Sequence, residues 1–298
     1  MFKKKLFIAT SSFAEGNKKL LKILKTNKIN FKLNELKRKL TPQELIHYAK
    51  DCSHIIAGTE KYDQATLSKL KKLKFIFRLG KGLDNINLQF AKEIKIKVIK
   101  SNTSLEKAVG ELTVGLILNL LRGISQHDNN LKKNIWKKEM GTILHGKKVG
   151  IIGYGKIGKY VSKILKAFGV KIIINDIKKI KNKLNLKKLL INSDIVSLHS
   201  NYSNKENYLL NRKNLKYLKK NSFIINTSRS ELIDYNFLFH LLKENKIKGA
   251  ALDVFDNEPY KGKFTKLNNV ILTPHIGSYA SEVRSQMEQE AIHSIIKD

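Results

Sequence analysis

Three short segments in the second half of the sequence carry residue types that could move a proton and hold an anion. The first contains Arg229, the second Asp253 and Glu258, and the third His275. A histidine whose pKa is raised by a neighbouring carboxylate can donate a proton to a forming alkoxide and take it back in reverse. An arginine can hold a carboxylate through two hydrogen bonds and polarise a 2-oxo group. Together these groups suit the reduction of a carbonyl by hydride, although each one alone has an ordinary structural explanation.

A glycine-rich turn, Gly153-Tyr154-Gly155-Lys156-Ile157-Gly158, follows a predicted strand and precedes an amphipathic stretch. The first glycine permits a tight turn, the second lets the backbone approach a pyrophosphate, and the third allows close packing of helix on strand. The helix that follows would present free N–H groups and a partial positive charge to phosphates. The pattern predicts a dinucleotide site, with a plain packing turn as the alternative.

The position of Asp176 indicates which dinucleotide is bound. Asp176 ends the strand after the glycine-rich turn. A carboxylate there can accept hydrogen bonds from the adenosine ribose hydroxyls and would repel a 2′-phosphate, which favours NAD over NADP. Lys178 and Lys179 follow closely and could offset that repulsion. An ordinary helix-entry role for Asp176 stays open.

These groups need a scaffold, and the sequence predicts one by alternating short apolar runs with helix-length segments. Helices are expected at Asn17–Lys25, Thr41–Lys50, Leu105–Gly123, Lys159–Phe168 and Tyr279–Ile296. The second of these begins with a capping-box pattern. Strands are expected at Lys5–Thr10, Ile29–Leu33, His54–Ala57, Phe75–Leu79, Ile96–Ile99, Val149–Ile152, Lys171–Asn175, Ile195–His199, Ser222–Asn226, Ala250–Val254 and Asn269–Leu272. Apolar strands separated by helices predict an α/β fold with parallel sheets covered on both faces.

Composition limits the classes of partner. The chain has 298 residues, enough for two domains, and a net charge of +33. Lysine is spread along the chain and only six residues are arginine, so we expect a compositional bias rather than a nucleic-acid binder. A single cysteine and the absence of a long apolar run predict a cytoplasmic protein without a membrane span.

The combined motifs resemble the D-isomer-specific 2-hydroxyacid dehydrogenase family, close to its phosphoglycerate dehydrogenase branch, along nearly the whole chain. Further matching segments are residues 78–86, 102–103, 109–113, 144–147 and 193–199. The resemblance implies two Rossmann-like domains with a cleft between them. The flavodoxin-like substrate domain would comprise residues 1–101 and 278–298, and the doubly wound NAD-binding domain residues 102–277. It also implies a dimer or a tetramer, and we expect a homodimer.

The resemblance assigns roles to individual residues. It makes Arg229 the substrate-orienting cation, Glu258 the partner of the histidine and His275 the acid/base, with no metal. Backbone amides around residues 80–82 would cradle the substrate carboxylate. The substrate-binding set is Arg78, Gly80, Lys81 and Gly82. The cofactor-binding set is Gly153, Gly155, Lys156, Ile157, Gly158, Asp176, Thr227, Ser228, Asp253 and Gly277.

The expected reaction is the interconversion of a D-2-hydroxy acid and its 2-oxo acid, of the phosphoglycerate type used in serine biosynthesis. Three positions depart from the family pattern. Asn201 replaces a common proline after the His199 segment, in the loop expected at the adenine pocket. Ser230 replaces a glycine after the catalytic arginine, which matters only where φ is positive. Residues 58–61 lie where some phosphoglycerate enzymes carry arginines for the substrate phosphate, and Lys61 is a less specific phosphate ligand.

Other functions remain possible on the sequence alone. Within the family, a glyoxylate, hydroxypyruvate or D-lactate-type reductase would use the same groups. Formate oxidation is disfavoured because formate-type members lack the carboxylate partner that Glu258 supplies. Outside catalysis, the fold could serve an NAD-sensing binding protein or corepressor, which the presence of Arg229, Glu258 and His275 disfavours.

Overall fold

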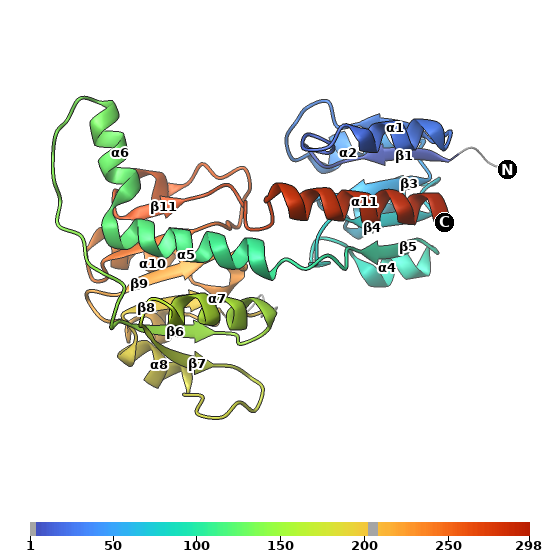
Figure 1. The fold of residues 1–298 in the computed structure, drawn as a ribbon. Coiled ribbons are helices and arrows are strands. Elements are labelled where there is room, and N and C mark those ends of the chain that lie inside the picture. The colour runs from blue at the N-terminus through green and yellow to red at the C-terminus, as the bar shows by residue number, and fades with distance from the viewer. Residues whose placement is uncertain (1–3, 202–207) are drawn as a thin grey trace. The chain divides into compact units, whose positions relative to one another are not determined.

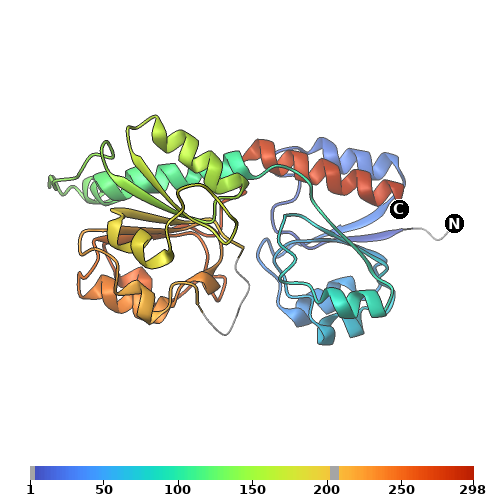
Figure 2. The same cartoon turned by 90° about the horizontal axis from the view of Figure 1, so that it is seen from below.

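The computed structural model describes residues 4–201 and 208–298, and the chain divides into two compact units (Figure 1). The first unit comprises residues 1–104 and 278–298, and the second comprises residues 105–277. Each unit has its own parallel sheet with helices on both faces (Figure 2). The predicted α/β class is confirmed, and all eleven predicted strands are present with ends within two residues of the expected ones.

The sheet of the first unit has five parallel strands in the order β2-β1-β3-β4-β5. This order matches the predicted flavodoxin-like arrangement. In that arrangement the order in which strands are added to the sheet reverses between β1 and β3, while all strands stay parallel. Helices α2, α3 and α4 cover one face, and α1 and α11 lie together beyond the other. The strands are β1 Lys5–Ile8, β2 Asn30–Leu33, β3 His54–Ala57, β4 Phe75–Arg78 and β5 Lys97–Lys100. The helices are α1 Lys19–Thr26, α2 Pro42–Ala49, α3 Gln64–Lys69, α4 Leu88–Glu93 and α11 Ser281–Lys297.

The sheet of the second unit has six parallel strands in the order β11-β10-β9-β8-β6-β7, with its switch point between β6 and β8. The strands are β6 Lys148–Ile152, β7 Lys171–Asn175, β8 Ile195–Leu198, β9 Phe223–Asn226, β10 Gly249–Leu252 and β11 Val270–Leu272. The α-helices are α5 Glu106–Arg122, α6 Ile124–Lys132, α7 Lys156–Lys166, α8 Leu186–Asn192, α9 Arg212–Leu215 and α10 Tyr235–Lys243. Two 3-10 helices, η1 Ser230–Leu232 and η2 Lys263–Lys266, complete the unit.

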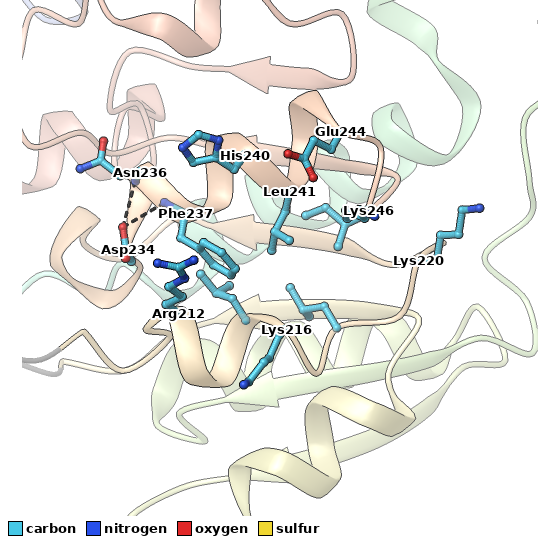
Figure 3. A pocket seen from close by; sticks show the side chains of 13 residues that line it. Arg212, Lys216, Lys220, Asp234, Asn236, Phe237, His240, Leu241, Glu244 and Lys246 are labelled. Atoms are coloured by element: carbon cyan, nitrogen blue, oxygen red, sulfur yellow. Dashed lines mark hydrogen bonds between the residues drawn. The ribbon is translucent and has the colours of Figure 1, made fainter.

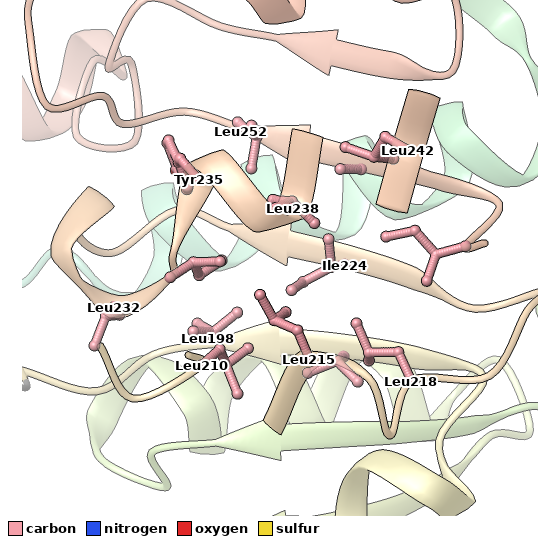
Figure 4. Close-up of a cluster of buried hydrophobic side chains, with 14 of the residues drawn as sticks. Leu198, Leu210, Leu215, Leu218, Ile224, Leu232, Tyr235, Leu238, Leu242 and Leu252 are labelled. Carbon is pink, nitrogen blue, oxygen red and sulfur yellow. The ribbon is translucent and has the colours of Figure 1, made fainter. Parts of the chain in front are cut away.

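Two apolar layers hold the second sheet in place. One layer packs α5 and α7 on the sheet and includes Val114, Val161 and Leu165. The other packs α8, α9 and α10 on the opposite face, where Leu238 and Leu242 meet the strand residues (Figure 4). Burying both faces fixes the strands, and therefore fixes where their carboxyl ends deliver polar side chains.

Most predicted helices agree with the structure, including the capping box at Thr41 and Glu44. The exception is α7, which begins at Lys156 rather than at Lys159. The low helix propensity of glycine is consistent with the expected start after Gly158. Close packing explains its inclusion, because a Cβ on Gly158 would lie 2.1 Å from the Gly153 carbonyl oxygen. Lys156, Ile157 and Gly158 therefore form the first turn of the helix.

No single helix in the described ranges is long and apolar enough to cross a membrane. The pair α5 and α6, bent by 65°, passes the same test by length and composition. The apolar side chains Val114, Leu116 and Ile117 of α5 are buried in the core of the second unit. This burial explains why α5 is so apolar.

A carboxylate of α11 holds the last residues of the first unit before the chain enters the second. Glu290 accepts hydrogen bonds from the Ser101 hydroxyl at 2.6 Å, the Asn102 N–H at 2.8 Å and the Thr103 hydroxyl at 3.1 Å. Burial raises the pKa of Glu290, but these hydrogen bonds outweigh it, and the pKa is lower than the ordinary value of 4.5.

We expect Glu290→Gln to destabilise the first unit by about 1–3 kcal/mol, because an amide cannot accept all of these hydrogen bonds. The contribution is present above the unfolded pKa and is lost as the pH falls through the lower folded pKa. Urea unfolding at pH 7 and pH 3 measures this contribution, and the difference in unfolding free energy between wild type and variant should be smaller at pH 3 than at pH 7. An equal gap at both pH values, or a matching loss in the exposed Glu35→Gln control, would contradict this reading.

Candidate active site

The glycine-rich turn leaves the carboxyl end of β6, next to the switch point of the second sheet. Gly153 has φ +90°, and a Cβ there would lie 2.6 Å from the backbone of His199. A Cβ on Gly155 would meet nothing within 4 Å, so this residue borders open space. The turn therefore has the tight first glycine, the approachable second glycine and the packed third glycine that a pyrophosphate cradle needs.

The start of α7 offers backbone donors to the same space. Gly155 is its N-cap and has no side chain that could accept a hydrogen bond from the first N–H groups of the helix. The first N–H groups of a helix have no partner within the helix and attract anions. Lys156 is exposed at this position and adds positive charge. These residues fit the phosphates of a dinucleotide.

Asp176 lies just beyond the end of β7, beside the turn. Its carboxylate accepts the Tyr154 N–H at 2.6 Å and the Lys178 N–H at 2.8 Å. Burial raises the pKa of Asp176, but the two backbone hydrogen bonds and the charges of Lys178 and Lys183 lower it by more. The pKa is therefore below its ordinary value. A carboxylate has about four acceptor positions, so the ionised side chain can still receive ribose hydroxyls.

Two polar atoms beside the turn are buried and have no hydrogen-bond partner in the described part of the chain, the Nδ1 atom of His199 and the hydroxyl of Ser200. The other ring nitrogen of His199 is 2.9 Å from the Ser197 hydroxyl, and burial lowers the pKa of His199 to about 3. Buried polar groups are normally satisfied, so their position beside Gly153 fits a site that receives a polar ligand.

Arg229 stands in the loop that follows β9. Asn226, fully buried at the end of that strand, donates to the Arg229 carbonyl at 2.8 Å and accepts the Ser228 N–H at 3.1 Å. The Ser228 hydroxyl donates to Leu198 O at 3.0 Å, and the Thr227 hydroxyl lies 3.0 Å from that of Thr113 in α5. The hydroxyls of Thr227 and Ser228, which were predicted to bind the cofactor, are thus both in hydrogen-bond contact with other groups of the protein.

The replacement of glycine by Ser230 costs no backbone strain. Ser230 begins the short helix η1 and is outside the left-handed region. The loop therefore keeps its shape with a serine.

His275 and Glu258 are brought together. The Nδ1 atom of His275 lies 2.9 Å from one carboxylate oxygen of Glu258 and 3.2 Å from the other. The Glu258 carboxylate also accepts the Phe255 N–H at 3.3 Å, which fixes its orientation. The histidine side chain is 34% exposed, so it can reach a ligand. A carboxylate on Nδ1 leaves Nε2 as the nitrogen that faces a reaction partner.

The backbone of His275 is in the left-handed region, with φ +57°. Such a conformation is uncommon for a residue other than glycine and needs support from its surroundings. Asp253 gives that support: its carboxylate accepts the Thr273 hydroxyl at 2.6 Å, the Ile276 N–H at 2.8 Å and the Gly277 N–H at 2.9 Å.

Asp253 and Asn226 are therefore positioning residues that the sequence interpretation did not find as such. Asp253 was expected to contact the cofactor, and Asn226 was not singled out. The available signal was the same in both cases, namely a polar residue at the end of an apolar strand. Such a residue, fully buried, has to find hydrogen-bond partners in the loops around it.

The predicted substrate loop follows β4 in the first unit. Arg78 is 9% exposed, and its guanidinium donates to the Leu79 carbonyl at 2.5 Å and to the Asn85 side chain at 3.4 Å. A Cβ on Gly80 would lie 2.7 Å from that guanidinium. Arg78 therefore supports the loop from beneath, while Lys81 is exposed and Gly82 partly exposed.

A pocket of about 770 Å³ lies elsewhere, in the outer helical layer of the second unit (Figure 3). It is lined by α9 and α10, including Arg212, Phe237 and His240, and by none of the predicted site residues. The pocket is lined by leucines and by charged side chains of both signs, and these do not converge on one point as catalytic groups would. Among the described residues, no group of three or more His, Cys, Asp or Glu side chains could hold a metal ion.

Comparisons with known proteins agree with this geometry. The family model for the NAD-binding domain of D-isomer-specific 2-hydroxyacid dehydrogenases matches residues 114–277. The chain is 38% identical to the D-3-phosphoglycerate dehydrogenase of Methanocaldococcus jannaschii over 82% of its length, although it spans only 49% of that protein. It is 37% identical to the hydroxypyruvate reductase of Thermotoga maritima over 82% of its own length and 83% of the relative.

A solved structure supports the same assignment. The D-lactate dehydrogenase of Aquifex aeolicus, complexed with NAD and lactic acid, has a TM-score of 0.82 and 25% identity, with 98% of this chain and 94% of that chain covered. The fold and the cofactor cradle define an NAD-dependent oxidoreductase. The chain belongs to the family of D-isomer-specific 2-hydroxyacid dehydrogenases.

Proposed function

We propose that this enzyme interconverts a D-2-hydroxy acid and its 2-oxo acid, with His275 as the acid/base. The observation that supports this most is the pairing of His275 Nδ1 with the Glu258 carboxylate at 2.9 Å. The pair leaves Nε2 to donate a proton to the substrate oxygen during reduction and to accept it during oxidation. Glu258 stabilises the positive charge that the ring carries before it gives up the proton.

Arg229 orients the substrate in this proposal. Its guanidinium can hold the substrate carboxylate and polarise the 2-oxo group, and Asn226 fixes the loop that carries it. The backbone amides of Lys81 and Gly82 form the second cradle for the carboxylate, while the Gly80 N–H is used within the loop, where it donates to the Arg78 carbonyl at 2.9 Å. When bound, NAD supplies the hydride chemistry, and the protein supplies orientation and the proton. Gly153, Gly155 and Asp176 are the residues proposed to hold it.

The choice of 2-oxo acid is the finer part of the proposal. The sequence favours the phosphoglycerate branch, which would place the enzyme in serine biosynthesis in the cytoplasm. One structural observation favours the glyoxylate or hydroxypyruvate alternative. Lys61, the cation expected near a substrate phosphate, is directed to Asp63 at 3.3 Å, and its side chain is 70% exposed.

A substrate panel tests the proposal. The purified protein should oxidise NADH, and NADPH more slowly, with at least one of hydroxypyruvate, glyoxylate, pyruvate, 2-oxoglutarate or 3-phosphohydroxypyruvate. No turnover across the panel, with NAD binding confirmed by calorimetry, would reject catalysis and favour an NAD-sensing role.

We also propose that the protein forms a homodimer through α6 and the segment that follows it. Large apolar side chains are exposed there, among them Leu131 at 56%, Trp136 at 80% and Met140 at 97%. Exposed large apolar side chains gathered on one segment are typical of an interaction site. Light scattering should give twice the 34.1 kDa chain mass, and Trp136→Lys should lower it towards the monomer. A monomeric wild type would contradict this proposal.

The arginines give no support to nucleic-acid binding. Arg38 pairs with Glu44 at 2.5 Å, and Arg284 pairs with Glu288 at 3.0 Å. Arg212 lies over the Phe237 ring at 5.3 Å. These three arginines therefore make contacts within the fold, although their guanidinium groups would otherwise suit bidentate contacts with phosphate. We propose small 2-oxo and 2-hydroxy acids as the partners.

A further inference from the structure

A buried carboxylate lies at the switch point of the first sheet, where open α/β sheets bind their ligands. The order in which strands are added to the sheet reverses between β1 and β3, and Thr10 and Gly58 follow these two strands. Glu60 folds back into this position and is only 2% exposed. A Cβ on Gly58 would lie 3.0 Å from the Glu60 carboxylate and 3.1 Å from the Thr10 methyl group.

Hydrogen bonds fix the Glu60 carboxylate in this position. The Gly58 N–H donates to it at 2.8 Å, and the buried Tyr62 hydroxyl lies at 3.5 Å. Beside it, the Thr10 hydroxyl is buried and has no partner in the part of the chain that the structure describes. A buried acceptor and an unsatisfied hydroxyl at a switch point are the features of a ligand-facing edge.

Glu60 is also linked to the predicted substrate loop. The Asn85 amide donates to Glu60 O at 2.6 Å and to Gly58 O at 3.1 Å, while its oxygen receives Arg78 Nε at 3.4 Å. The same Arg78 guanidinium lies beneath Gly80. The backbone that carries Glu60 and the loop proposed to cradle the substrate are therefore connected within the first unit.

The charge at this edge opposes a second anionic group on the substrate. Burial raises the pKa of Glu60 above its ordinary value, although the Gly58 N–H and the Arg78 charge offset part of that rise. A phosphoryl dianion would meet repulsion from the ionised carboxylate, or would require the carboxylate to take up a proton. Lys61, which could offset that repulsion, is directed to Asp63.

We propose that Glu60 is a specificity-determining residue that excludes phosphorylated substrates, so that the enzyme acts on small unphosphorylated 2-oxo acids such as hydroxypyruvate or glyoxylate. This inference rests on the proposed function, because it names the substrate class of the same reaction. It selects the reductase alternative over the phosphoglycerate one.

The test compares kcat/KM for hydroxypyruvate and for 3-phosphohydroxypyruvate with NADH. Wild type should prefer the unphosphorylated acid by at least about 100-fold, since placing like charges together is costly. Glu60→Gln keeps an oxygen that can accept the Gly58 N–H but removes the charge, and should narrow the preference by about 10-fold or more. Glu60→Asp keeps the charge and should retain the preference. Glu93→Gln removes an exposed carboxylate from the same unit and should leave the ratio unchanged.

The outcomes separate this inference from the proposed function. Preference of the wild type for the phosphorylated acid, or a ratio that Glu60→Gln does not move, would overturn the role of Glu60 while leaving the dehydrogenase intact. Equal narrowing by Glu60→Gln and Glu60→Asp would show that loop shape, not charge, sets the preference, and would overturn it too. No turnover of any 2-oxo acid in the panel, with NADH bound, would overturn the proposed function and this inference with it.

Discussion

His275→Asn should lower kcat by about 100-fold or more, because general acid catalysis by a positioned side chain contributes at least that factor. Asparagine is close in size and can still hydrogen-bond to Glu258, but it cannot deliver a proton at neutral pH. NADH binding and the unfolding midpoint should stay near those of wild type, since the ring is at the edge of the fold and 34% exposed.

The matched control is His240→Asn, on the exposed side of α10 and away from the paired carboxylate. It should leave kcat unchanged. Activity of His275→Asn within a few-fold of wild type would remove His275 from the acid/base role and direct attention to another proton donor.

Asp253→Asn should lower kcat by about 100-fold as well, without removing a group that touches the substrate. The carboxylate receives three hydrogen bonds from residues 273–277 and so holds His275 in its left-handed conformation. An amide would face N–H groups with its own NH₂, and a displacement of about 1 Å at a catalytic group can cost about 100-fold in rate. We expect an accompanying loss of stability of about 1–3 kcal/mol.

Two readouts separate positioning from general damage. The KM of the 2-oxo acid should change less than kcat, because Asp253 acts through His275 rather than on the bound acid. Asp256→Asn, an exposed carboxylate three residues further on, should have little effect on either. A variant that is folded at the assay temperature and fully active would show that the turn holds His275 without Asp253.

The sequence predicts the structure well for those features that depend on residues close together in the chain. The strands are short apolar runs bounded by turns, and their burial on both faces leaves little freedom in where they begin and end. The glycine spacing of residues 153–158 depends on backbone geometry at a strand end, so it could be predicted from residue types and order. The pairing of Glu258 with His275 was expected from the resemblance to the family, and the structure brings the two side chains together.

What could not be predicted depends on contacts between distant segments. The start of α7 was misplaced because the packing of Gly158 against Gly153 outweighs the low helix propensity of glycine. The position of Glu60 depends on a reversal of sheet order that brings β3 beside β1. The support of His275 by Asp253 crosses twenty-two positions and needs parallel pairing of β10 with β11. No local pattern reports such contacts.

The most direct measurement combines NADH oxidation with the configuration of the product. Wild-type enzyme with NADH and hydroxypyruvate should consume the two in equal amounts and yield glycerate, and chiral chromatography should show the D-enantiomer alone. The L-enantiomer, or no oxidation of NADH by hydroxypyruvate or any other acid of the panel while NADH is bound, would contradict the account.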